Sequence, residues 1–142
     1  MAAVSLLALL NVFGQWPTSA TVEASAATLE VRSPAAVRGG LFFQARFTVR
    51  ARRELKAATL VLGRGWLEGL TVNTVEPSPL NEASRDGRLS LELGHIPAGE
   101  KYVLYIQYQV NPTTVGSRTQ RLALDDGNER ILMAEKTLRV FP

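Results

Sequence analysis

The stretch LFFQARFTVRA, residues 41–51, constrains the fold more than any other part of the sequence, because its apolar residues recur at every second position. This period places alternate side chains on opposite faces of an extended strand. The apolar face is made by Leu41, Phe43, Ala45, Phe47, Val49 and Ala51. The other face, which is mostly polar, is made by Phe42, Gln44, Arg46, Thr48 and Arg50. The pattern is typical of an antiparallel strand with one face in a core and the other in water.

The same alternation continues along most of the chain. Short alternating runs follow one another at roughly 8 to 12 residue intervals, separated by Gly, Pro, Asn and Asp. They include residues 28–32, 58–63, 69–75, 88–93, 102–110 and 121–141, the last of which turns back on itself over 125–128. A single helical turn is expected over 53–57. The spacing predicts an all-β fold, an immunoglobulin-like antiparallel β-sandwich of about seven to eight strands.

The N-terminal segment MAAVSLLALLNVFGQW, residues 1–16, is uncharged and strongly apolar. Its apolar part, residues 2–14, is shorter than the roughly 20 residues that span a bilayer, and no basic residue precedes it as in a signal peptide. It is therefore either an atypical signal peptide or part of a longer membrane helix that begins before Met1. Trp16 favours the helix, because Trp is enriched where helices leave the bilayer. A buried helix of a cytosolic domain is the third alternative.

These observations predict three parts. Residues 1–16 are expected to form a hydrophobic helix that acts as a membrane anchor or signal peptide, 17–27 a linker of small residues, and 28–142 the sandwich domain. The expected location is the cell membrane, with a single membrane pass and the domain on the extracytoplasmic side. The domain is secreted instead if the N-terminal segment is cleaved.

Composition excludes several kinds of site. The 142 residues contain no cysteine and one histidine, so disulfides and thiolate metal sites are excluded. The net charge of +3 is spread along the chain without a nucleic-acid-binding module, and no nucleic acid partner is expected. His95 lacks the neighbours of a metal site or catalytic triad. Asp125 and Asp126 are expected to belong to a hairpin turn and not to a calcium loop.

No cofactor and no enzymatic activity are expected, because no nucleophile, metal or cofactor motif stands out. One alternative stays open, a glycosidase-like pair of carboxylates. Its candidates are Glu68, Glu76, Glu82 and Glu92.

The stretch GHIPAGEKY, residues 94–102, nearly matches a phosphate-binding loop. Gly94 and Gly99 have the required separation, but Glu100 precedes Lys101 and the following Tyr102 is no metal-binding hydroxyl. Such a loop must also open a helix, whereas the residues that follow alternate as a strand. We therefore expect a tight connection between two strands and no nucleotide site.

The most distinctive candidate for recognition is GRGWLEGLTVNTVEP, residues 63–77. Trp and Arg dominate binding hot spots, so Arg64 and Trp66 with Asn73 form a candidate binding surface. Arg46 and Arg50 on the polar face of 41–51 are added to it. For Trp66 the alternative is a core position between the sheets, and for the arginines it is a solvated face.

The stretches ALLNVFGQ, RGGLFFQARF, GWLEGLTVNTVEPSP, LGHIPAGEKY and VNPTTVG together resemble a family of small, single-pass membrane-anchored proteins of unknown function from high-GC Gram-positive bacteria. Residues 91–110 are also similar to the late strands of bacterial cell-surface immunoglobulin-like domains. The resemblance implies a short cytoplasmic N-terminus, one membrane helix and an outside domain that spaces, adheres or assembles.

The expected function is therefore a noncatalytic extracytoplasmic structural or protein-interaction module, tethered to the membrane. Its partner is unknown, and the candidates are an envelope protein and an envelope polymer. The alternative is a module that binds a cell-envelope polymer, a carbohydrate, through Trp66 and the nearby arginines.

Overall fold

The computed structural model describes residues 17–85, 87–112 and 116–141. The helix predicted over residues 1–16 lies outside this range. Within it, we find no helix with the length and apolar character needed to cross a bilayer. The described residues form eleven strands and one short 3-10 helix, η1 (Arg64–Trp66).

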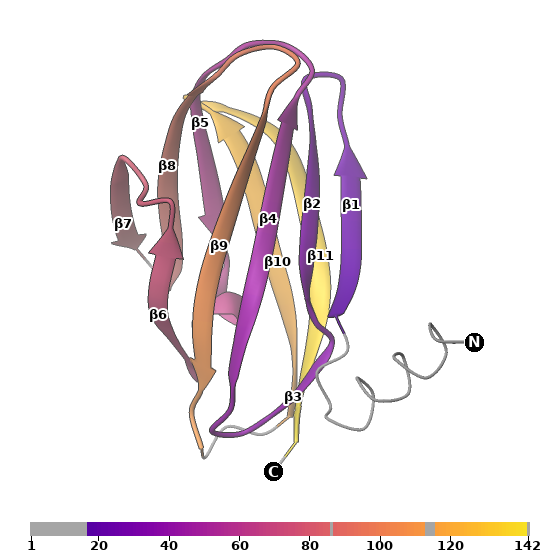
Figure 1. The fold of residues 1–142 in the computed structure, drawn as a ribbon, viewed down its shortest axis with the longest axis vertical. Helices are drawn as coiled ribbons and strands as arrows, with labels where there is room; N and C mark the ends of the chain where they lie inside the picture. Colours follow the sequence, from indigo (N-terminus) through magenta and orange to yellow (C-terminus); the bar gives the residue numbers. More distant parts are fainter. Residues whose placement is uncertain (1–16, 86, 113–115, 142) are drawn as a thin grey trace, which may run out of the picture.

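The strands form two sheets that pack face to face (Figure 1). The five-stranded sheet has the order β1 (Pro17–Glu23), β2 (Ala27–Pro34), β4 (Phe42–Ala51), β9 (Lys101–Val110) and β6 (Leu70–Glu76). The six-stranded sheet has the order β3 (Ala36–Arg38), β11 (Glu129–Phe141), β10 (Gly116–Asp126), β5 (Leu55–Leu62), β8 (Arg88–Ile96) and β7 (Asn81–Arg85). All pairs are antiparallel except the short β3–β11 pair. The predicted β-sandwich is confirmed, but the predicted number of about seven to eight strands is too low, since the described residues form eleven.

The prediction of a linker over 17–27 is wrong for its first seven residues. They form β1, which pairs with β2 from Pro17 opposite Pro34 to Glu23 opposite Thr28. Their side chains alternate between half-buried and exposed from residue 18 to residue 23. The small residues that suggested a linker therefore also carry the period of an edge strand, which the ladder to β2 stabilises.

The helical turn predicted over 53–57 is also wrong, because β5 begins at Leu55. The register between β5 and β8 shifts at two places, between Leu55 and Ala58 and between Ala58 and Thr59. A β-bulge adds a residue to one strand and moves the following side chains to the other face. The bulge lets both Leu55 and Ala58 be buried, a spacing of three that imitates a helix.

The core lies between the sheets and is built around β4 and β9. On β4 every predicted inward residue from Phe43 to Ala51 is buried, and the outward ones are half-buried or exposed. Leu41, which precedes the strand, is the exception and is 40% exposed. The inward face of β9 is formed by Leu104, Ile106, Tyr108 and Val110, all buried as predicted.

Trp66 lies where the chain crosses from β5 in one sheet to β6 in the other, and it is fully buried. Its ring packs edge-on against Phe47, with 5.2 Å between the ring centroids, and stacks on Tyr108, with 6.1 Å between the centroids. Tyr108 in turn stacks on Phe43 at 5.0 Å. Burial raises the pKa of Tyr108 far above its ordinary value, so this hydroxyl stays protonated. Trp66 is a core residue, and the prediction that it anchors a ligand at the surface is wrong.

We expect Trp66→Ala to lower the free energy of unfolding by about 3–5 kcal/mol, because it leaves a cavity beside Phe47 and Tyr108. Trp66→Phe keeps part of the aromatic contact and should lower it less. Met133→Ala, at a residue that is 58% exposed, is the surface control and should change stability by no more than about 0.5 kcal/mol. Urea unfolding measures all three. A loss for Trp66→Ala no larger than that of the control would contradict the core assignment.

Candidate functional site

The structure does not bring the predicted binding residues together. Arg46 and Arg50 lie on the outer face of the five-stranded sheet, where Arg46 pairs with Glu30 at 3.4 Å. Asn73 is exposed at a bulge of β6, between Val72 and Thr74. Only Arg64, in η1, lies beside the groove described below. The surface predicted from these residues therefore does not exist as one site.

The stretch GHIPAGEKY turns a corner, as predicted. Strand β8 runs to Ile96 and β9 starts at Lys101, so the connection carries the chain from one sheet to the other. Gly99 has a φ of 83°, the left-handed region that favours glycine. His95 is at the rim, with its Nε2 3.8 Å from Glu54 Oε1.

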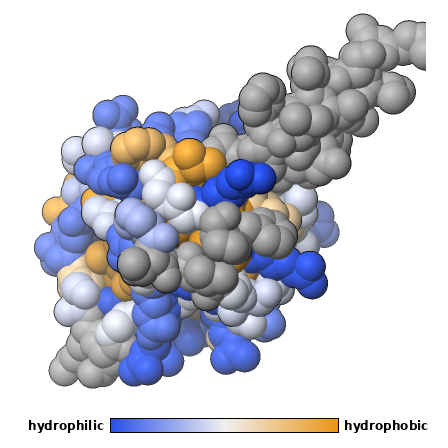
Figure 2. All heavy atoms as spheres, turned by 90° about the horizontal axis from the view of Figure 1, so that it is seen from below, coloured by the Kyte–Doolittle hydropathy of each residue, from blue (hydrophilic) through white to orange (hydrophobic). Residues whose placement is uncertain are grey.

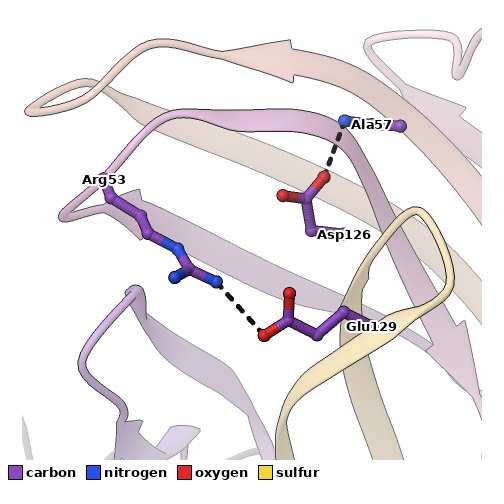
Figure 3. Close-up of polar contacts among 4 residues, drawn as sticks. All are labelled: Arg53, Ala57, Asp126 and Glu129. Carbon is purple, nitrogen blue, oxygen red and sulfur yellow. Dashed lines mark hydrogen bonds and ion pairs between the residues drawn. The ribbon is translucent and has the colours of Figure 1, made fainter.

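The residues around 125–129 form the hairpin turn predicted for them, with Gly127 at a φ of 60°. Asp126 Oδ1 accepts a hydrogen bond from the backbone N–H of Ala57 at 2.9 Å, and Glu129 pairs with Arg53 at 3.3 Å (Figure 3). Asp125 pairs with Arg130 at 3.0 Å. In the described part of the chain, no group of three or more His, Asp or Glu is placed to hold a metal ion. Asp126 and Glu129 tie the hairpin to β5 and to the loop before it, whereas the Asp125–Arg130 pair lies within the hairpin.

Two of the four glutamates left open as a catalytic pair lie on neighbouring strands but do not face each other. Glu82 is opposite Leu91, and Glu92 is opposite Asn81, on the neighbouring strands β7 and β8. This offset of one residue sends the two carboxylates to opposite faces of the sheet. Glu82 instead lines a shallow hollow of about 360 Å³ beside the bulge at Asn73.

A groove of about 530 Å³ opens on the outer face of the six-stranded sheet. Its floor follows a row across three strands, in which Ala123 of β10 lies opposite both Val61 of β5 and Met133 of β11. Four arginines from different elements surround this floor: Arg64, Arg88, Arg121 and Arg130. No acidic side chain is found among the described lining residues.

Two glycines, Gly63 and Gly65, leave room for the groove. A Cβ atom at Gly63 would lie 2.9 Å from the carbonyl oxygen of Arg121, and one at Gly65 would run into the carbonyl oxygen of Thr119. The chain leaving β5 therefore lies directly against the backbone of β10, which only glycine allows here. The backbone N–H of Gly63 donates a hydrogen bond to the carbonyl oxygen of Arg121 on β10. On the other side of β5, Leu62 pairs with Leu89 of β8, and Arg88 directly precedes Leu89. Gly63 therefore leaves no side chain between Arg121 and Arg88.

Two of the groove arginines are held by carboxylates at its rim. Asp125 raises the pKa of Arg130 through a hydrogen bond and through its charge. Arg121 Nε lies 3.7 Å from Glu135 Oε2, and both of these side chains are more than half exposed. The side chain of Arg64 lies against the turn at Gly87. Only Arg64 was singled out from the sequence. Arg121 and Arg130 lie on the two strands of the β10–β11 hairpin, and Arg88 joins them only through the pairing of β8 with β5 and of β5 with β10.

Lys136 is a buried polar residue that sequence reasoning missed. It takes an inward position of β11, between Ala134 and Leu138, and exposes 9% of its surface. Its Nζ donates a hydrogen bond to the carbonyl oxygen of Ser33 at 2.9 Å. Burial lowers the pKa of the Lys136 ammonium from its ordinary 10.5. The signal was present in the sequence, since Lys136 falls on the apolar phase of the alternation.

We expect Asp126→Ala to lower the free energy of unfolding by about 1 kcal/mol, because the N–H of Ala57 loses its acceptor. Asp126→Asn keeps an acceptor oxygen and should lower it less. Thermal unfolding of the three proteins measures the loss of stability, and repeating it with calcium tests whether Asp126 binds the ion. Stabilisation of the unmodified chain by millimolar calcium, absent in Asp126→Ala, would contradict a purely structural role.

The lowered pKa of Lys136 predicts a pH dependence. Between that lowered value and 10.5 the unfolded chain holds a proton that the folded protein has released, so the free energy of unfolding rises with pH through this window. Below the window the cost of burying the charge is fully present. Lys136→Met removes the titrating group, so in urea unfolding the free energy of unfolding of the unmodified protein should rise relative to that of Lys136→Met as the pH approaches 10.5. Parallel stability profiles would contradict this.

No protein-family model and no curated protein matches this sequence. Solved structures share its architecture. The protein AvmM, whose structure is described as catalysing macrocyclization in alchivemycin A biosynthesis, matches with a TM-score of 0.56 and 9% identity, over 89% of this chain and 96% of that one.

Two further solved domains are similar as well. The CARDB domain of PF1109 from Pyrococcus furiosus has a TM-score of 0.54 and 14% identity, covering 84% of this chain and 97% of that one. The third cohesin ScaC of Acetivibrio cellulolyticus, solved in complex with the ScaB dockerin, has a TM-score of 0.50 and 11% identity, covering 75% and 94%. At these identities the likeness shows the fold alone, an immunoglobulin-like β-sandwich.

Proposed function

We propose that this chain is a noncatalytic protein-interaction module that works outside the cytoplasm and is tethered to the membrane by its N-terminal segment. The observation that carries the interaction role is the arginine-lined groove on the outer face of the six-stranded sheet. Arg and Met are enriched in the buried centres of protein interfaces, and both occur here around a concave floor. A cohesin of the same fold is solved with its dockerin partner.

The lining of the groove also argues for binding without catalysis. Its described residues offer guanidinium groups, apolar side chains and the hydroxyl of Thr119, but no carboxylate or imidazole that would serve as a general base. The sandwich fold itself decides nothing, because one fold carries binding and catalysis in different proteins. The polymer-binding alternative loses the anchor on which it depended, since Trp66 is sealed in the core.

The geometry is consistent with a tether at the N-terminus. The start of β1 and the end of β11 lie at the same end of the sandwich (Figure 1). The described residues visible at that end are mostly hydrophilic, with small hydrophobic patches between them (Figure 2). A domain anchored through residues 1–16 would therefore stand in water above the bilayer, with the loops at 24–26, 52–54, 97–100 and 127–128 at its far end.

The absence of cysteine from the sequence allows a direct test of location. A single cysteine placed at the exposed Glu100, in the full chain, should react with a membrane-impermeant maleimide on intact cells of the source organism. The label should stay with the membrane fraction after an alkaline wash if the tether is retained. Labelling only after lysis would contradict the extracytoplasmic location. Chemical crosslinking on the same cells should join the domain to a protein, and its failure would count against the interaction role.

A further inference from the structure

We infer that the groove on the outer face of the six-stranded sheet binds an acidic polypeptide segment, with an apolar side chain of that segment on the floor between the arginines. This inference rests on the proposed function, which says that a protein partner exists but not which face meets it. It names the face and the chemistry of the partner segment.

The floor provides the apolar half of the site. Met133 is 58% exposed, although it lies in the middle of a long strand and not at a loop tip. It lies beside Ala123, which is small, and Val61 follows on the next strand. A large apolar residue next to a small one leaves a depression that an incoming Leu, Ile or Met side chain can fill. Met is flexible and polarisable, and it adapts to different partners.

The arginines provide the charged half. Four guanidinium groups line the groove, and carboxylates at its rim pair with two of them, Asp125 with Arg130 and Glu135 with Arg121. The Arg121–Glu135 pair is long and well exposed, and such pairs contribute little to stability. A carboxylate of the partner can therefore take the place of Glu135 at Arg121. Guanidinium groups bind carboxylates through two parallel hydrogen bonds, which gives the contact direction as well as charge.

Gly63 keeps the space between the charges open. It lies between Arg121 on β10 and the position of Arg88 on β8, and it has no side chain to fill the gap. Both arginines can then reach carboxylates on one bound segment. The close approach of Gly65 to Thr119 holds this wall against β10, so the groove is preformed and little ordering is needed on binding.

The combination favours a polypeptide over a phosphate-rich envelope polymer. A polyphosphate chain would satisfy the arginines but would place charged groups over Met133 and Val61. A peptide with acidic residues on both sides of one apolar residue matches both parts of the groove.

The test uses the full 142-residue chain in a mild nonionic detergent and a fluorescent 12-residue peptide of Asp, Glu and Ser with one central Leu. Anisotropy should show saturable binding that weakens as salt is raised. A peptide with Asn and Gln in place of the acids, and a peptide with Ser in place of Leu, should each bind about tenfold more weakly or worse. Changes in the ¹H–¹⁵N spectrum should centre on residues 61–65, 119–123 and 130–133.

Two variants probe the two halves of the site. Arg88→Glu and Met133→Asp should each weaken the acidic peptide about tenfold or more. Arg50→Glu makes the same charge change on the opposite sheet and should leave binding unchanged. Each variant must keep a dispersed spectrum. If Arg88→Glu fails this check, Met133→Asp, at a more than half-exposed residue, carries the test alone.

The proposal is overturned if no peptide binds, if the neutral peptide or inorganic polyphosphate binds as well as the acidic one, or if Arg50→Glu weakens binding as much as Arg88→Glu. Crosslinking on intact cells separates this failure from failure of the proposed function. A partner joined equally to the unmodified chain and to Arg88→Glu would leave the interaction role standing and exclude this groove. Loss of the crosslinked partner in Arg88→Glu, together with the peptide result, supports both.

Discussion

Packing of β4 against β9, with Trp66 beside them, is the contact on which the rest of the structure depends. Phe43 and Phe47 of β4 meet Tyr108 of β9 and the indole of Trp66 in one continuous group of rings. These residues come from the centre of the five-stranded sheet and from the crossing between the sheets. A cysteine-free domain has no covalent crosslink, so burial of this apolar surface must offset the entropy of ordering the chain. The outer faces are then left for other uses.

The connection from β5 through η1 to β6 serves the core and the groove together. Trp66 turns inward and fills the space between the sheets, whereas Arg64, two residues earlier, lies on the outside over Gly87. Gly63 and Gly65 bring the same segment against β10. The shape of the groove is therefore coupled to the packing of the core through four consecutive residues. A surface supported in this way is held in place by the most stable part of the domain.

Much of the fold could be predicted from the sequence, because period-two alternation directly reports which face of a strand is buried. It placed the inward residues of β4 and β9 and the hairpin at 125–128. It failed at β1, where small residues have little apolar contrast, and at β5, where a bulge changed the spacing. The site was less accessible. Arg88, Arg121 and Arg130 stand on three strands, and pairing between strands far apart in sequence follows from tertiary packing that no local pattern records.

The pairing of β1 has a mechanical consequence. Because β1 and β2 are antiparallel over seven residue pairs, a pull on Pro17 directed away from the domain acts along the strand axis. Such a load shears all the rungs of the ladder at once and does not open them one after another. At the opposite end, Arg52 pairs with Glu23 and Arg53 with Glu129, which links the last residue of β1 to the start of β11 through the β4–β5 loop. Tension entering at Pro17 would thus load the whole β1–β2 ladder before β1 detached.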